Sequence, residues 1–459
     1  MGKGVLAGRA ARGGARGCLA AACLLCALAA AAQHGKDHDP HAPPIERSHP
    51  ERIPLKPTLA PAFSIATDAL GFSPPGSLYL GNRIALASLD FLDENRLLFT
   101  FRIPGLIRRQ TGSDDENEER HIKAVVLSLP DGAVQAESIW ELHDRSQYLW
   151  MLKDGHFLVR DRDELKMGDA SLDLKPYLRF PGPLISVELD PTQQYLVTNS
   201  REPAKAGAAA AGMVGSPDTA KADVTTTGSG GNDPFRSGAP PNMVLRILRR
   251  DTGQVMLVSR VRSAVKLPLN PDGYLEMLPG KGVEWVINMN DFGGKSSQVG
   301  RVDSSCSPTN QFLSPQEFLV TTCNRDEMLG YVAMTTDGRR LWEDAPTSSP
   351  VRALMVVSPD GSRLARESLA VTHAVTAYSP LDSDDIKGQL VEVFDAATGK
   401  IELESPATPI LDGGGNVAFS PSGRRVAVLN AGAIQVFDLP APAAPPTDPG
   451  QTQARKSGP

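Results

Sequence analysis

The sequence predicts an all-β fold, a seven-bladed β-propeller, and three observations lead to it. Short apolar runs alternate with turn signals, and the body of the chain has no long amphipathic stretch with helical spacing. An apolar run followed by Ser-Pro-x-Gly, a basic residue and a second apolar run occurs at 354–365 and again at 417–428. The Val-Phe-Asp triplets that follow these two phrases are 43 residues apart, which is typical of propeller blades with four short strands.

Each phrase is interpreted as the two inner strands of one blade. Proline presets φ at the second position of the turn, and glycine accepts the positive φ later in it. Degenerate versions of the phrase bring the number of expected inner hairpins to seven: 86–101, 148–161, 185–200, 265–278, 310–323, 354–365 and 417–428. Second elements of blades are expected at 125–134, 245–257, 332–342, 390–401 and 434–440. Six or eight blades stay open as alternatives, because the units between 140 and 310 are degenerate.

The last unit stops after its third strand, at Leu439. A strand from the N-terminal region, around 62–70, is expected to supply the fourth strand of that blade. Such a strand would close the ring and remove the exposed edges that one open sheet would carry.

The composition divides the chain around this propeller, which we assign to 59–440. Residues 1–32 have a basic start, a short apolar stretch and an Ala-Ala-Ala end, which together predict a cleaved signal peptide. Residues 33–58 are predicted to be a disordered linker rich in His and Pro. The insertion 204–242 and the tail 441–459 are small, polar and rich in Gly or Pro, so we expect them to be disordered too.

Charge and hydropathy exclude two classes of partner. Removing the signal peptide removes Lys3, Arg9, Arg12 and Arg16 and no acidic residue, so the formal net charge moves from -6 to -10. Nucleic-acid phosphates require a basic surface, and we therefore expect no nucleic-acid partner. No later segment has the roughly 20 apolar residues of a membrane helix, so the exported chain is not expected to span a membrane.

Two cysteines, Cys306 and Cys323, remain after the signal peptide. If 306–323 is a hairpin that turns near Ser314-Pro315-Gln316, the two residues lie nearly opposite each other on adjacent strands. Opposed Cα atoms are about 4.5 to 5.5 Å apart, within the range of a disulfide. We predict a disulfide between them; the alternative is two buried thiols.

The phrases SPDG, FSPSGRRVAV and VEVFDAATGKI resemble the bacterial WD-repeat-like β-propeller superfamily, including its YVTN-type members. The resemblance covers about 360 residues as architecture and is close in sequence over 350–440. No blade has the Trp-Asp ending or the Gly-His pair of true WD repeats. The resemblance implies a scaffold for recognition more than a defined chemistry, because fold does not fix function.

Few motifs suggest chemistry. An acidic loop at 382–388 contains Asp382, Asp384 and Asp385, the candidates we would choose for a hard cation. Carboxylates also cluster at 111–120, and His34, His38 and His41 lie in a tract with Asp37 and Asp39. In each case a solvated loop or linker is the competing interpretation, and no metal site is assigned. GGKSS at 293–297 lacks the first Gly of a phosphate-binding loop and is interpreted as a turn.

No catalytic or cofactor residue is assigned, and no cofactor is expected. The chain has no Gly-x-Ser-x-Gly and no His-Glu-x-x-His, and the histidines of the body, His121, His143, His156 and His373, are scattered singly. We therefore expect an exported binding or scaffolding module whose protein or polymer ligand meets the loops around the central channel.

Two alternatives are kept. The first is a propeller hydrolase or lyase acting on extracellular polymers, which requires three or more titratable side chains to converge in the channel. The second is a quinone-dependent dehydrogenase, which usually needs a regularly placed Trp in each blade, whereas this chain has four Trp in all.

Processing of the signal peptide is directly testable. We expect the exported chain to begin at Gln33, because cleavage follows the small residues that end at Ala32. Intact-mass measurement of protein recovered from the secreted or periplasmic fraction checks this. A mass that still includes residues 1–32 in that fraction would contradict it.

Overall fold

The computed structural model describes residues 53–74, 85–103, 120–144, 146–202, 243–325, 328–344, 353–372 and 383–442. Within these ranges the chain is all-β, with no α-helix and two short 3-10 helices, η1 (Asp68–Leu70) and η3 (Ser383–Asp385). The strands form seven four-stranded antiparallel sheets, and these are the blades of a β-propeller. The predicted fold class and the blade count of seven are therefore confirmed.

Blades I to VI each use four consecutive strands, with the first strand innermost. Blade I contains β2 (Ala87–Asp93), β3 (Arg96–Arg102), β4 (Arg120–Ser128) and β5 (Val134–Leu142). Blade II contains β6 (Leu149–Met151), β7 (Phe157–Asp161), β8 (Glu164–Gly168) and β9 (Lys175–Arg179). Blade III contains β10 (Leu184–Leu189), β11 (Tyr195–Arg201), β12 (Met243–Arg249) and β13 (Val255–Val261). Blade IV contains β14 (Leu269–Asn270), β15 (Gly273–Pro279), β16 (Glu284–Asp291) and β17 (Ser296–Asp303). Blade V contains β18 (Thr309–Phe312), β19 (Glu317–Cys323), β20 (Leu329–Thr335) and β21 (Arg340–Asp344). Blade VI contains β22 (Leu354–Val357), β23 (Arg363–Val371), β24 (Ile386–Asp395) and β25 (Ile401–Ala407). Blade VII contains β26 (Val417–Phe419), β27 (Arg425–Asn430), β28 (Ala433–Asp438) and β1 (Phe63–Ala66).

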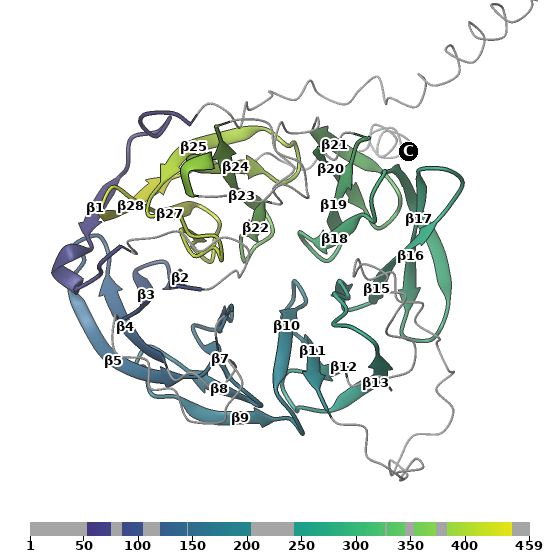
Figure 1. The fold of residues 1–459 in the computed structure, drawn as a ribbon, viewed down its shortest axis with the longest axis horizontal. Coiled ribbons are helices and arrows are strands. Elements are labelled where there is room, and N and C mark those ends of the chain that lie inside the picture. The colour runs from purple at the N-terminus through teal and green to yellow at the C-terminus, as the bar shows by residue number, and fades with distance from the viewer. Residues whose placement is uncertain are drawn as a thin grey trace, which may run out of the picture. The chain divides into compact units, whose positions relative to one another are not determined.

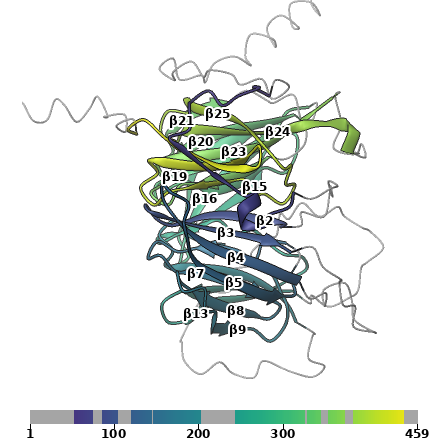
Figure 2. The same ribbon diagram turned by 90° about the vertical axis from the view of Figure 1, so that its left-hand side faces the viewer.

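All seven inner hairpins lie where the sequence predicts them. The two strong phrases are the strand pairs β22–β23 and β26–β27, which occupy equivalent places in blades VI and VII. Figure 1 shows the ring along its axis, with β10, β18 and β22 near the centre and β5, β9 and β13 on the rim. Figure 2 shows β3, β4 and β5 of one blade side by side.

The N-terminal strand closes the ring as predicted. β1 pairs antiparallel with β28, with Phe63 opposite Val436 and Ala66 opposite Ala433. Just before it, residues 53–58, which we assigned to the linker, run beside blade VI. The Thr58 amide donates to the Glu404 carbonyl at 2.9 Å, and the Glu404 amide donates to Thr58 Oγ1 at 2.9 Å. The N-terminal segment is thus bonded to β25 of blade VI and to β28 of blade VII, and β1 is the outer strand of blade VII.

The hydrophobic core consists of seven clusters of buried side chains, and each cluster lies between two neighbouring blades. Strand β27 shows how one strand serves two clusters. Val426 and Val428 pack with blade VI, whereas Ala427 and Leu429 pack with blade I. Successive side chains of a strand point to opposite faces of the sheet. Because both faces of a blade are covered by its neighbours, its strands need an unbroken run of apolar residues.

The turns between the two inner strands also join neighbouring blades. Glu94 of blade I accepts a hydrogen bond from the Ser422 amide of blade VII at 2.7 Å. Asn270 of blade IV donates to the Pro315 carbonyl of blade V at 2.7 Å. The Ser-Pro-Asp-Gly turn of blade VI packs so closely on blade V that a Cβ atom on Gly361 would lie 2.7 Å from the Leu313 carbonyl oxygen.

A buried ion-pair network links blades V and VI. Arg366 on β23 is 2% exposed and bonds to Asp344 of blade V at 2.6 Å and to Glu392 of blade VI at 2.7 Å. Its guanidinium carbon lies 5.1 Å from the ring centre of Tyr331 and 5.0 Å from that of Phe394. Removing one member of such a network leaves a buried charge without its partner, which is strongly destabilising.

Two glycines separate the effect of the blade contact from the effect of backbone conformation. Gly361 has φ 77° and Gly432 has φ 76°, but a Cβ atom on Gly432 would meet nothing within 4 Å. We expect Gly432→Ala to lower the free energy of unfolding by about 1–2 kcal/mol, the cost of a left-handed alanine. Gly361→Ala should cost clearly more, because the Leu313 backbone must also move. Urea denaturation of both variants checks this, and equal losses would contradict the proposed turn contact.

Candidate functional site

The structure has a cavity of about 350 Å³ lined by the inner strands and turns of blades II to VI. Polar and apolar residues contribute about equally to its wall. The polar and aromatic residues that line it are Gln147, Trp150, Lys153, Glu188, Asp190, Gln193, Lys266, Asn310, Gln311 and Ser358. Small-ligand sites are usually concave, with polar groups that orient the ligand beside apolar side chains.

The cavity wall contains an acid, Glu188, and a base, Lys266, that interact electrostatically. Glu188 lies on β10, and Lys266 lies just before β14 of the next blade. Burial raises the pKa of Glu188, while Lys266 and the Leu267 amide oppose that rise by stabilising its charge. The buried Asn199 fixes the segment that carries Lys266, since its side chain donates to the Val265 carbonyl at 2.9 Å and accepts from the Val265 amide at 3.1 Å.

Trp150 is held in the cavity wall by Arg160. The Arg160 guanidinium carbon lies 5.9 Å from the Trp150 ring centre. Arg160 is 2% exposed, pairs with Asp144 at 3.2 Å and donates to the Ile185 carbonyl of blade III at 2.9 Å. The side chain that supports the indole therefore also joins blade II to blade III.

Two polar residues that line the cavity are committed to turns. Both oxygens of Asp190 accept bonds within its own turn, from the amides of Tyr195 and Thr192. Gln193 accepts a bond from the Lys153 amide at 2.6 Å and donates to the Met151 carbonyl at 3.0 Å, which joins the turns of blades II and III. The titratable groups left for chemistry are Glu188, Lys153 and Lys266.

A second buried acid, Glu367, lies between blades VI and VII. It is 3% exposed, and its partner among side chains is the neutral Gln389, which donates to it at 3.1 Å. Burial raises the pKa of Glu367 to about 8, although the amides of Asn416 and Gly415 stabilise its charged form. Asp90 on the inner strand of blade I behaves similarly: burial raises its pKa to about 6 against the hydrogen bond from Ser88.

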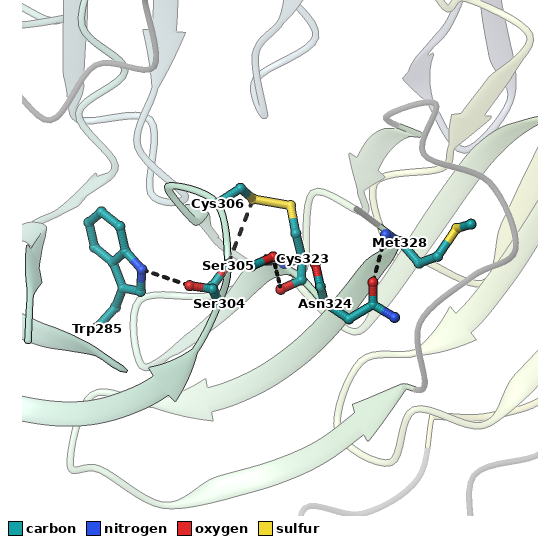
Figure 3. The surroundings of a disulfide bond; sticks show 7 residues. All are labelled: Trp285, Ser304, Ser305, Cys306, Cys323, Asn324 and Met328. Carbon is teal, nitrogen blue, oxygen red and sulfur yellow. Dashed lines mark hydrogen bonds between the residues drawn. A yellow bond between two sulfur atoms is a disulfide. The ribbon is translucent and has the colours of Figure 1, made fainter. Parts of the chain in front are cut away.

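The predicted disulfide is present and replaces the alternative of two thiols. Cys306 and Cys323 have Cα atoms 5.6 Å apart. The hairpin turns where predicted, since the Leu313 amide donates to the Glu317 carbonyl. Cys306 precedes β18, so the bond joins the incoming loop to the end of β19. Figure 3 shows the Ser304 carbonyl accepting from Trp285 Nε1 at 3.1 Å and Ser305 donating to the Cys323 carbonyl.

The cation candidates are only partly described. Asp384 and Asp385 lie in η3, where the Asp385 carbonyl accepts a bond from the Thr372 amide at 2.8 Å. Asp382 lies outside the described residues, as do the tract 34–41 and nearly all of the acidic loop 111–120. Across the residues that the structure describes, no three His, Cys, Asp or Glu side chains gather closely enough to hold a metal ion. Asp382, Asp384 and Asp385 therefore stay candidates only, and no metal site is assigned to them.

The histidines lie apart, each beside a carboxylate. His143 Nδ1 is 2.8 Å from Asp161, His156 is 3.3 Å from Asp154, and His121 is 3.8 Å from Glu141. His373 lies outside the described ranges. GGKSS spans the turn from β16 to β17, as predicted, and the Asp291 amide donates to the Lys295 carbonyl there.

Comparisons with known proteins give a fold-level likeness. No family model and no curated protein matches the chain. Among solved structures it is similar to the Pyrococcus horikoshii acylaminoacyl peptidase, with 10% identity and a TM-score of 0.43 over 82% of this chain and 55% of that one. It is also similar to the Kuenenia stuttgartiensis hydrazine synthase, with 10% identity and a TM-score of 0.41 over 81% of this chain and 100% of that one. The chain thus spans about half of the peptidase. Neither likeness carries a conclusion about activity.

Within the described residues, no helix has the length and hydropathy that a membrane span requires.

The raised pKa of Glu367 predicts a pH-dependent stability. Folding favours the protonated form of Glu367. Its contribution to the free energy of unfolding is therefore full below about pH 4.5, the usual pKa of a glutamate, and is lost as the pH rises through about 8. We expect Glu367→Gln to remove this decline and to gain stability relative to the natural chain between pH 5 and pH 9, by an amount on the order of a few kcal/mol. Urea denaturation across that range checks the prediction, with the exposed Glu141→Gln as a control. A constant difference between variant and natural chain would contradict it.

Proposed function

We propose that the chain is an exported binding module of the WD-repeat-like superfamily, and that its ligand occupies the cavity of the inner strands. The observation that carries the proposal is that five neighbouring blades each contribute residues to one cavity of about 350 Å³. A side chain from any one blade would recognise little alone, whereas the ring brings an indole, two ammonium groups, a carboxylate and several amides to one place.

The chemistry of the wall favours binding over catalysis. The cavity offers one carboxylate with a raised pKa, Glu188, next to Lys266. Amides, which bind and orient polar ligands without transferring protons, make up much of the remaining polar wall: Gln147, Asn310 and Gln311.

The export assignment rests on the predicted signal peptide and on the disulfide. Disulfides persist in oxidising compartments outside the cytoplasm. The bond between Cys306 and Cys323 therefore supports an exported location and is independent of the N-terminal sequence. We propose a secreted or periplasmic protein on these two grounds.

The second candidate, a polymer-cleaving propeller enzyme, is favoured by Glu188 alone. A carboxyl group with a raised pKa in a cavity can act as a general acid. Asp190, the other carboxylate of the wall, is bonded within its turn and does not provide the paired acid that such reactions use. Binding thus explains more of the wall than catalysis does.

A cavity-blocking variant tests the binding proposal. Asn310→Trp places an indole in the cavity, and Ser297→Trp places the same side chain on the exposed surface of β17 as a matched control. Immobilised natural chain and both variants are incubated with an envelope extract of the producing cells, and retained molecules are identified by mass spectrometry. We expect a species retained by the natural chain and by Ser297→Trp to be lost, at least tenfold, with Asn310→Trp.

Two results would overturn the proposal. The first is that no species is retained above the empty matrix. The second is that Asn310→Trp retains the same species as the natural chain, which would place binding outside the cavity. Far-ultraviolet circular dichroism of each variant verifies that the blades are still folded.

A further inference from the structure

Two outer strands of the ring expose apolar side chains. Seven large hydrophobic residues are exposed among the described ones, and four of them lie on β5 and β13: Val134 and Ile139 on β5, and Met256 and Val258 on β13. Ile139 is 57% exposed and Val258 is 44% exposed. Both strands are terminal strands of their sheets, in blades I and III, and both lie on the rim in Figure 1.

The other described outer strands carry features that discourage pairing with a further strand. Pro176 interrupts β9, and Pro406 lies in β25, whose edge also bonds to Thr58. β17 exposes Ser and Gln side chains, β21 has five residues and none of them is exposed, and β1 has only four residues. Proline, polar side chains and short length are the usual means of blunting a sheet edge. β5 and β13 have nine and seven residues and no proline.

We propose that β5 of one copy of this chain pairs antiparallel with β13 of a second copy, so that two blades form one continuous sheet. The exposed side chains alternate on both strands, at Glu137, Ile139 and Glu141 on β5 and at Met256, Val258 and Arg260 on β13. On each strand these side chains point away from the hydrophobic cluster shared with the next blade, into which Trp140 of β5 and Leu257 of β13 pack.

Antiparallel pairing with Ile139 opposite Val258 places Glu137 opposite Arg260. An apolar pair and an oppositely charged pair then lie on the same face of the joined sheet, and each adds about 0.2–1 kcal/mol. Glu137 also pairs with Lys123 at 3.1 Å in its own sheet, and the charge of Arg260 helps to lower the pKa of Glu202 in blade III. The new pair therefore extends two existing groups of charged side chains. The contact is small, and we expect weak association.

The charges favour this pairing over β5 with β5. A symmetric β5 pair centred on Ile139 would set Glu137 opposite Glu141 twice, and like charges directly opposite are destabilising. A symmetric β13 pair centred on Val258 sets Arg260 opposite Met256 and gains no charge pair. Because β5 and β13 are different surfaces, their contact is head-to-tail and continues from copy to copy unless it closes into a ring.

Sedimentation velocity of the full chain, from about 10 μM to about 1 mM, tests the proposal in the range of weak interfaces. We expect the mean mass to rise beyond that of a dimer. Ile139→Lys and Val258→Glu should each abolish the rise, whereas Val283→Lys, a comparably exposed loop substitution, should leave it unchanged. A chain that stays monomeric throughout the range would overturn the proposal.

Charge reversal identifies the strand partners. Glu137→Arg alone and Arg260→Glu alone should each weaken association at least threefold, because each sets like charges opposite one another. The double variant should restore association to within twofold. If Val258→Glu abolishes association and Ile139→Lys does not, β13 pairs with itself and the proposal is wrong. Unchanged circular dichroism excludes misfolding as the cause.

Discussion

Each blade of this protein has two apolar faces, and a blade alone can bury neither of them. The seven hydrophobic clusters all lie between blades, so the fold is stable only as a complete ring. This makes the closing contact between blades VII and I as important as any other. β1 completes blade VII, and its Ile65 joins the cluster shared with blade I. The N-terminal strand therefore belongs to the last blade in space although it comes first in the chain.

Polar groups enter these apolar interfaces where they can bond across two blades. Asn199 bonds to Val265 of blade IV, and Arg366 bonds to Asp344 of blade V. Such bonds fix the register of neighbouring blades, since a buried polar group without its partner is costly. Glu367 differs because its side-chain partner is the neutral Gln389, and burial raises its pKa although the amides of Asn416 and Gly415 stabilise its charged form. Protonation of Glu367 is thus coupled to the packing of blade VI on blade VII.

Much of the architecture could be predicted because it depends on local chemistry. The Ser358 and Ser420 hydroxyls each accept a bond from the amide of the basic residue that follows the turn, Arg363 or Arg425. In the degenerate blade III, Asp190 accepts from the Tyr195 amide in the same way. Turn chemistry therefore survives substitution and can be found from the sequence. The cavity could not, because Trp150, Glu188, Lys266 and Asn310 are brought together by the rotation between blades, which no spacing along the chain encodes.

The irregular blades still contain a signal for the site. The inner strands β6 and β14 have three and two residues, whereas β2 of blade I has seven. A shortened inner strand leaves the residues before it outside the sheet, and Gln147 and the segment 266–268 line the cavity from such positions. Blades II and IV are also among the units whose repeats are most degenerate in sequence. Strand length alone does not mark the site, because the inner strand β26 of the regular blade VII also has three residues. In blades II and IV a short inner strand coincides with a degenerate repeat, and departures from local regularity are expected at functional sites.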